Sequence, residues 1–376
     1  MKGKRLFLAA LLAMCVAAMG LMFGCSGGSE EEAANQGEAP QAATATVTDD
    51  AGREVVIPAP EAMEKIYYTN HVGQIYCMTL VPDLCAGVTM DFTEQELAYL
   101  PERFASLENL GTSYSGKELS PEALMAEGIQ VIFSISSFDL TDKDITDAED
   151  LQAQTGIPVV LLEGSLDKTA ECYVKLGKML GVEAQAQELA DYCTTTLDQV
   201  AAAVATIPED ERVSLYYAEG PEGLQTEPTS SSHALILEMS GAKNVAVDME
   251  VEGGKGKSLV SMEQVLAWDP QVIIAWDEQR YEGGADELIR TSENWAPVKA
   301  VQDGRVYTMP QAPFSWIDRP GAVNRIIGLQ WLTNLLYPEA YDVDMVQVTQ
   351  EFYSLFYHHE LTEQEAKDLL GNSYQG

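Results

Sequence analysis

Short runs of apolar, often β-branched residues alternate with longer amphipathic stretches along most of the chain. Runs of this kind, bounded by turn residues, are typical of buried strands. Strands are predicted at residues 54–58, 65–69, 84–89, 129–134, 158–162, 213–218, 271–276 and 305–309. Because helical stretches separate most of these runs, the pattern predicts an α/β protein with mainly parallel sheets.

The alternation stops between residues 166 and 206, where apolar residues recur every three to four positions. This spacing indicates one long helix with a single buried stripe, although Gly181 offers a point at which it can split. About 35 helical residues would span about 50 Å. Such a helix between two α/β segments predicts a rigid connector; the alternative is an ordinary surface helix within one continuous domain.

Two lobes are expected on either side of that connector. The N-terminal lobe is predicted at residues 46–165, the connecting helix at 166–206 and the C-terminal lobe at 207–376. Ligands of parallel α/β sheets bind beyond the carboxyl ends of the strands, so the ligand cleft is expected between the lobes.

The N-terminus has the pattern of an export signal. Basic residues precede an apolar run that ends at Gly24, and polar sequence follows too closely for a convincing membrane-spanning anchor. Residues 1–24 are therefore predicted to be a signal peptide. Residues 25–45 are small, polar or acidic and have no apolar period, so they are predicted to be a flexible tether.

The residues Met22, Phe23 and Gly24 before Cys25 resemble a lipoprotein cleavage box, although such boxes usually have Leu at the position of Met22 and a small residue at that of Phe23. The resemblance implies cleavage before Cys25 and acylation of its thiol. The alternative is an ordinary secretory peptide with an incidental cysteine. We expect a protein that is exported and anchored by this lipid to the outer face of the cell membrane, or one that is periplasmic.

The net charge and the cysteine content limit the kinds of partner and metal site that the protein can have. The formal net charge of −37 disfavours nucleic acid and anionic membrane surfaces, so the lipid would be the protein's only membrane contact. Four cysteines lie beyond the signal and the lipid site, without the spacing of a metal motif: Cys77, Cys85, Cys172 and Cys193. Disulfides are compatible with export, and buried thiols are equally compatible with this sequence.

A weak internal repeat supports the two lobes. Residues 122–133 align without gaps to residues 263–274. A serine two positions before Glu122, and another before Glu263, can cap a short helix that leads into a buried strand. Each glutamate would then lie near a helix N-terminus, where the helix dipole favours a negative charge.

Several segments resemble the metal-chelate class of ABC-transporter substrate-binding proteins, which capture ferric siderophores, haem or cobalamin. They are spread along most of the mature chain, at residues 47–58, 241–246, 261–274 and 295–310. The resemblance implies two Rossmann-like lobes and no intrinsic cofactor. It also implies a monomer that binds an iron chelate, haem or a corrinoid and delivers it to an ABC importer, whose permease dimer works with a cytoplasmic ATPase.

In that family one glutamate of each lobe docks onto arginines of the permease. Glu122 and Glu263 match those positions, which the resemblance therefore identifies as docking residues. The N-terminal copy departs from the family, because Ile129 and Gln130 replace the usual Pro-Asp before the strand.

Candidate ligand-binding residues are those that follow predicted strands. They are Asn70, His71, Tyr76, Ser136 and Phe138 in the N-terminal lobe, and Tyr217, Glu219, His233, Trp276, Trp316 and Arg319 in the C-terminal lobe. His71 would suit an axial ligand to iron or cobalt, or it caps the following helix. Arg319 would suit a carboxylate or catecholate of a chelate, or it pairs with Asp318 or another acid.

Other functions have less support in the sequence. Residues 251–258 are one glycine short of a phosphate loop, so we expect a flexible loop there. We find no nucleophile elbow and no metalloprotease helix, so no enzyme is predicted. Capture of free metal ions is disfavoured because only four histidines occur, two of them adjacent at 358 and 359. A surface receptor or adhesin on the same scaffold is a further alternative.

Overall fold

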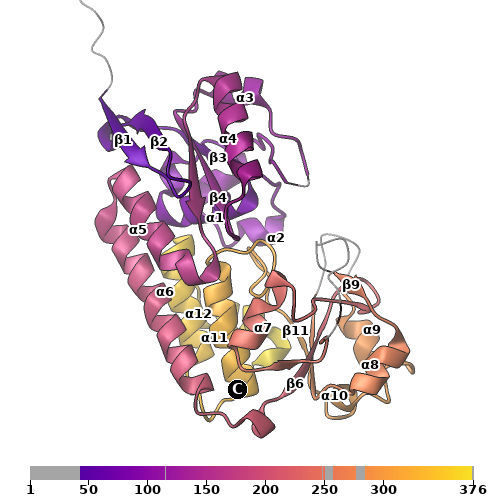
Figure 1. Cartoon of the computed structure of the whole chain (residues 1–376). Coiled ribbons are helices and arrows are strands. Elements are labelled where there is room, and N and C mark those ends of the chain that lie inside the picture. Colours follow the sequence, from indigo (N-terminus) through magenta and orange to yellow (C-terminus); the bar gives the residue numbers. More distant parts are fainter. Residues whose placement is uncertain (1–42, 115, 248, 250–256, 277–283, 375–376) are drawn as a thin grey trace, which may run out of the picture. The chain divides into compact units, whose positions relative to one another are not determined.

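Figure 1 shows the computed structural model of the chain, which describes residues 43–376 apart from 115, 248, 250–256, 277–283 and 375–376. The predicted signal peptide, most of the tether and Cys25 lie outside these residues. So does most of the segment that resembles a phosphate loop. Among the residues described, no helix is both long and apolar enough to cross a membrane.

The N-terminal lobe is built on a parallel sheet with the strand order β3-β4-β5, preceded by an antiparallel hairpin of β1 and β2. Its strands are β1 (Thr44–Thr48), β2 (Glu54–Pro58), β3 (Ile66–Tyr68), β4 (Val131–Ser136) and β5 (Val159–Glu163). Its helices are α1 (His71–Leu80), α2 (Glu94–Leu97), α3 (Pro121–Glu127) and α4 (Asp142–Thr155). Residues 84–89, predicted to be a strand, form only isolated bridges, such as that between Ile66 and Cys85.

The C-terminal lobe has a second parallel sheet with the order β11-β10-β6-β8 and an antiparallel pair of β7 and β9. Its strands are β6 (Ser214–Ala218), β7 (Gln225–Thr226), β8 (Lys243–Asn244), β9 (Ser258–Leu259), β10 (Val272–Ala275) and β11 (Val306–Thr308). Its helices are α7 (Leu235–Met239), α8 (Met262–Trp268), α9 (Asp286–Thr291), α10 (Lys299–Gln302) and α11 (Asn324–Leu336). The predicted α/β class with parallel sheets in two lobes is thus confirmed.

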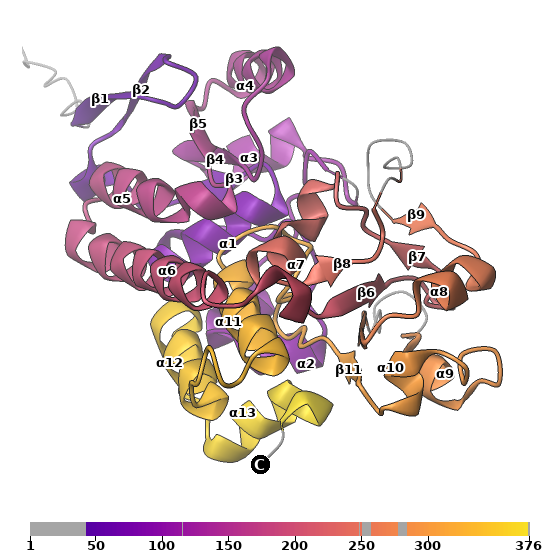
Figure 2. The ribbon, with the colours of Figure 1, turned by 60° about the horizontal axis from the view of Figure 1, so that its bottom comes forward.

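The predicted single connecting helix is wrong, because the chain forms two helices, α5 (Thr169–Leu180) and α6 (Glu183–Val204). Gly181 ends α5 in the left-handed conformation at φ 71°, which glycine adopts without strain. The two helices then lie side by side (Figures 1 and 2). Helix α5 packs on α1 of the N-terminal lobe, and α6 continues to α7 and α11 of the C-terminal lobe.

Helix α12 (Met345–Tyr357), followed by α13 (Glu363–Leu370), also joins the lobes. It packs on α11 and on α1, so its assignment to the C-terminal lobe alone, as the boundaries 207–376 imply, is incomplete. The ring of Tyr353 lies 5.7 Å from that of Tyr99, and Nε2 of His358 lies 3.0 Å from the carbonyl oxygen of Thr79. One continuous apolar core therefore runs through both lobes.

The four cysteines that follow Cys25 are all buried and unpaired thiols. Burial raises the pKa of each of them, that of Cys85 to about 12. They are therefore protonated core residues at neutral pH, and their thiols are unreactive.

Candidate functional site

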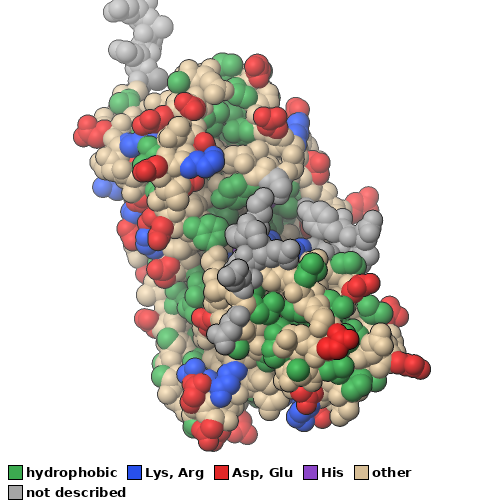
Figure 3. Space-filling view, turned by 45° about the vertical axis from the view of Figure 1, so that its right-hand side comes forward, with side chains coloured by type: hydrophobic (Ala, Val, Ile, Leu, Met, Phe, Trp, Pro, Cys, Tyr) green, Lys and Arg blue, Asp and Glu red, His purple; other side chains and the backbone are tan. Residues whose placement is uncertain are grey.

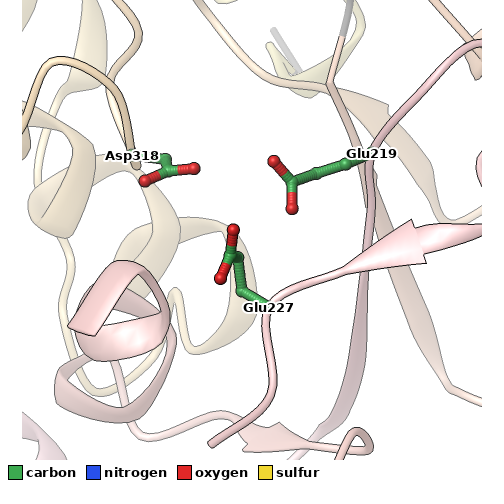
Figure 4. A group of neighbouring side chains, drawn as sticks. All are labelled: Glu219, Glu227 and Asp318. Atoms are coloured by element: carbon green, nitrogen blue, oxygen red, sulfur yellow. The ribbon is translucent and has the colours of Figure 1, made fainter. Parts of the chain in front are cut away.

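Three buried carboxylates converge in the C-terminal lobe (Figure 4). Glu219 follows β6, Glu227 follows β7, and Asp318 lies in the loop between β11 and α11. One carboxylate oxygen from each residue lies within 4.8 Å of the other two, and all three residues are 0% exposed. We call these three residues the carboxylate cluster.

Local structure holds each member of the cluster in place. The backbone N–H of Glu219 donates to the carbonyl of Gln225 at 2.8 Å, which closes the turn between β6 and β7. Oε2 of Glu227 accepts a hydrogen bond from Oγ of Ser231 at 2.6 Å. The backbone N–H of Asp318 donates to Oγ of Ser315 at 3.2 Å.

Glycine at position 328 sets how closely α11 approaches the loop that carries Asp318. A Cβ atom on Gly328 would lie 1.6 Å from the carbonyl oxygen of Trp316. The loop is thus pressed against the helix. Nε of Arg325 donates from α11 to the carbonyl of Asp318 at 3.3 Å.

Arg319 supplies the cluster with a positive charge. Its Nη1 lies 3.1 Å from Oε1 of Glu219, its Nη2 lies 2.6 Å from Oε1 of Glu227, and it also contacts Asp318. Burial opposes the charged form of Arg319, but the three carboxylates outweigh burial and raise its pKa. Of the alternatives open for this arginine, the structure therefore shows the intramolecular pairing.

The guanidinium of Arg319 does not provide a hydrogen-bond partner for every oxygen of the three acids. Burial raises the pKa of Glu219 well above its usual range, and repulsion by Asp318 and Glu227 adds to that shift. Oε2 of Glu219 is buried and has no hydrogen-bond partner among the residues described. Oδ1 of Asp318 lies 2.5 Å from Nδ1 of His233, yet these two atoms do not meet in hydrogen-bond geometry.

The two lobes meet at this point. His233 lies in a short 3₁₀ helix, and its ring centroid is 6.0 Å from that of Phe138, which follows β4 in the N-terminal lobe. Nζ of Lys257 lies 3.8 Å from the ring centroid of Trp276, and Nε1 of Trp276 donates to Oε1 of Gln311 at 2.8 Å. The structure thus brings together four of the predicted residues at the boundary between the lobes: Phe138, His233, Trp276 and Arg319.

Four other predicted residues lie in the core rather than at that boundary. Asn70 is 3% exposed and accepts the backbone N–H of Gly73 at the start of α1. Tyr76, Tyr217 and Trp316 are each fully buried. Side chains on a strand and on the helix after it also point into the sheet–helix layers, as those of Tyr217 and Tyr76 do. A role of these four residues in ligand binding stays a prediction.

His71 and Ser136 remain partly exposed. Nδ1 of His71 lies 2.7 Å from Oγ1 of Thr89. His71 is the first residue of α1, and Asn70, not His71, caps that helix. Oγ of Ser136 accepts the backbone N–H of Phe138 at 3.1 Å. Coordination of iron or cobalt by His71 stays a prediction.

The two repeated helices begin as predicted. Oγ of Ser120 accepts the backbone N–H of Ala123 at 3.2 Å, and Oγ of Ser261 accepts that of Gln264, also at 3.2 Å. Ser258, the last residue of the segment that resembles a phosphate loop, enters β9 instead of a helix. A phosphate loop would lead directly into a helix, which the described end of this segment does not do.

Glu227 is the member of the site that the sequence did not indicate. It follows β7, a strand of only two residues, which is too short to produce an apolar alternation. The sequence indicates Glu219 and Arg319 because they follow longer, buried strands. The proximity of Glu227 to them depends on how the loops fold back.

The sequence model of the periplasmic binding protein family matches residues 116–313, and the chain belongs to that family. It is 31% identical over 175 residues to the molybdate-binding protein MolA of Haemophilus influenzae, a match that covers 46% of this chain and 47% of that protein. The match thus spans about half the length of this curated relative.

Solved structures show the same fold over most of the chain. An ABC transporter solute binding protein from Sulfurospirillum deleyianum has a TM-score of 0.76 and 30% identity, over 86% of this chain and 98% of that one. A periplasmic solute binding protein from Veillonella parvula has a TM-score of 0.70 and 22% identity, over 88% and 100%. The chain is therefore a two-lobed solute-binding protein.

Proposed function

We propose that this protein captures a metal chelate outside the cytoplasm and delivers it to an ABC importer. The observation that carries the proposal is the buried carboxylate cluster, with Arg319 and His233, at the boundary between the lobes. Family membership and the similarity to an ABC transporter solute binding protein support the transport role.

The charge of the site favours one kind of ligand. Three carboxylates contact the guanidinium of Arg319, while the raised pKa of Glu219 favours the neutral form of that acid. The charge of Lys257 also acts on Glu219, and that of Arg325 interacts with Asp318. A bare oxyanion, such as the molybdate that MolA binds, would have to compete with three carboxylates for the guanidinium of Arg319. An iron chelate, haem or a corrinoid of neutral or positive net charge fits better, because His233 and Trp276 offer it an imidazole and an aromatic face.

Titration of the purified protein, followed by visible absorption, tests the ligand class. The panel contains haemin, cobalamin and ferric siderophores of negative, neutral and positive charge, with molybdate followed by calorimetry. We expect saturable binding of a neutral or cationic chelate, and at least tenfold weaker binding by His233→Ala. His359→Ala, a change outside the site, is the control. Binding of molybdate together with no binding of any chelate would reject the proposal.

The residues proposed to dock on the importer are Glu122 of α3 and Glu263 of α8. Both side chains are exposed near a helix N-terminus. Beside them, Met125 and Leu266 occupy equivalent positions and are 47% and 39% exposed. Figure 3 shows hydrophobic side chains among acidic ones over the face of the C-terminal lobe that carries α8 and α9. Charge-assisted contacts from such carboxylates to arginines would fix the orientation of the complex.

Charge reversal at both positions separates docking from ligand binding. The double variant Glu122→Lys/Glu263→Lys is expected to keep the ligand affinity of the parent and to lose import into cells. Glu188→Lys, an exposed acid on α6, is the matched control. Normal import by the double variant would exclude this docking mode and would leave a receptor or adhesin role open.

Attachment to the membrane is proposed to depend on Cys25 alone. Replacing its thiol by a hydroxyl in Cys25→Ser would prevent acylation. We expect the variant to appear in the soluble fraction after cell lysis, whereas the parent sediments with membranes. Sedimentation of Cys25→Ser with membranes would contradict the lipid anchor.

A further inference from the structure

We propose that Glu219, Glu227 and Asp318 form a metal-coordination site in which the guanidinium of Arg319 holds the place of the cation. The inference rests on the proposed function, because the cation would be the metal of the captured ligand. It adds that the protein itself contributes ligands to that metal.

The donor set and its spacing suit a metal ion. Metal–oxygen distances of about 2.0 to 2.4 Å allow ligand oxygens to lie at most about 4.8 Å apart. The three carboxylates meet that limit, since one oxygen of each lies within 4.8 Å of the others. Carboxylate oxygens are ligands of divalent metals. His233 stands beside the group, with its Nδ1 2.5 Å from Oδ1 of Asp318, and is not one of its three members.

A second observation distinguishes this cluster from an ordinary group of acids. Oε2 of Glu219 is buried, lacks a hydrogen-bond partner within the described part of the chain, and points into the cluster (Figure 4). Nδ1 of His233 and Oδ1 of Asp318 face each other at 2.5 Å and are likewise outside hydrogen-bond geometry. A cation bound in the cluster would give Oε2 of Glu219 the partner that Arg319 does not provide.

Arg319 is placed so that its guanidinium can move out of the carboxylate cluster. Its side chain is 26% exposed, whereas the side chains of the three acids are 0% exposed, so the guanidinium enters the cluster from the solvent side. Its central carbon already lies 6.0 Å from the ring centroid of Trp276. The face of that ring can hold the displaced guanidinium by a cation–π contact.

The site would leave part of the metal's coordination sphere open. His233 is 19% exposed and stands at the edge of the cluster next to Phe138 of the other lobe. The acids approach the cation from the C-terminal lobe only. The remaining positions would face the boundary between the lobes, where the donors of a chelate can complete the sphere.

Metal binding by the purified full-length protein tests the inference with Co²⁺ and Ni²⁺ alone as probes, without any chelator. Affinity is measured by isothermal titration calorimetry, and the Co²⁺ absorption bands report the coordination. We expect Arg319→Gln to bind both ions at least tenfold more tightly than the parent, because it removes the competing cation. Glu219→Gln, which keeps the shape of the side chain, is expected to bind them at least tenfold more weakly.

Two controls separate the site from the general negative charge of the protein. Arg290→Gln removes an exposed arginine, which pairs with Asp286, and Glu188→Gln removes an exposed acid. Neither should change the affinity. If Arg319→Gln does not fold, Asp318→Asn in the otherwise unchanged chain provides the second test and should weaken binding as Glu219→Gln does.

The outcomes distinguish this inference from the proposed function. Equal metal affinity of the parent, Glu219→Gln and Asp318→Asn would overturn the metal site, even if a chelate still binds and is imported. An unchanged affinity of folded Arg319→Gln would overturn the role of Arg319. Metal binding that depends on the cluster would support the site even if no chelate were transported.

Discussion

Asn70 shows how the fold uses a polar residue where a ligand contact is expected. It follows β3, but its Oδ1 caps α1 by accepting the N–H of Gly73 at 2.8 Å. Its Nδ2 donates to the carbonyl of Ile135 on β4 at 3.1 Å. The side chain therefore ties helix α1 to strand β4.

Replacing Asn70 by alanine removes both hydrogen bonds. We expect Asn70→Ala to lower the free energy of unfolding by about 1 to 3 kcal/mol, because a helix cap is lost and a buried carbonyl loses its donor. Denaturant unfolding measures this change. Asn70→Asp keeps the cap acceptor and should lose less. Undiminished stability combined with weaker ligand binding would instead identify Asn70 as a ligand contact.

His358 lies at the contact between α12 and the N-terminal lobe, and its burial there makes the stability of the protein depend on pH. Burial lowers the pKa of His358, although the carbonyl of Thr79 and the charge of Asp83 act against that shift. An unfolded histidine titrates near about pH 6.5. At a pH between the lowered pKa of folded His358 and this value, the unfolded chain binds more protons than the folded protein. The free energy of unfolding therefore falls as the pH drops below about 6.5.

The variant His358→Asn should lose this part of the pH dependence. Asparagine tolerates the left-handed conformation that His358 adopts at φ 54°, and it does not titrate. Thermal unfolding at pH 7.5 and pH 5.5 measures the effect. On lowering the pH from 7.5 to 5.5, we expect the unfolding temperature of the parent to fall by a few degrees more than that of the variant. Equal falls in both proteins would contradict the role of His358 in the pH dependence.

At the scale of the elements, the hairpin of α5 and α6 replaces the long rod that the periodicity predicted. The apolar spacing continues across Gly181, because both helices bury a stripe against the same core. Close packing of the pair depends on Gly177, where a Cβ atom would lie 2.2 Å from Cβ of Ala186. A pattern of apolar positions does not reveal that the chain reverses direction between them.

Exchanging the two small residues tests this packing. Gly177→Ala alone should lower the free energy of unfolding by about 1 to 3 kcal/mol, since an extra methyl group is forced into a packed contact. The double variant Gly177→Ala/Ala186→Gly restores the space and should recover most of the loss. Chemical denaturation of the single and double variants measures the coupling. Equal stability of both variants would show that the helices are not in close contact.

The sequence predicted buried strands well and the site less well. Parallel strands covered on both faces are continuous apolar runs, which is why β4, β5, β6 and β10 were found. The run at 84–89 was apolar but pairs only at single residues. Glu227 and the enclosure of Arg319 by acids depend on contacts between residues far apart in the chain, such as the 92 positions between Arg319 and Glu227.

At the scale of the molecule, helices α5, α6 and α12 bridge the lobes, and one continuous core runs through both, beside a second, smaller core within the C-terminal lobe. Binding proteins whose lobes are joined by flexible strands close widely, whereas packed helices permit only small hinge or shear movements. We therefore expect a nearly constant radius of gyration, about 20 Å for a compact body of this size. Small-angle scattering with and without bound ligand measures it. A marked compaction on ligand addition would rule out the rigid connection.

The contact between α12 and α1 also bears on the order in which the protein folds. His358 and Thr79 are 279 positions apart, yet they meet across the two lobes. A chain made from its N-terminus onward exposes the apolar side of α1 until α12 has been synthesised. Loop closure over such separations slows folding. The N-terminal lobe should thus remain incompletely packed, and open to chaperones, until nearly the whole chain has emerged.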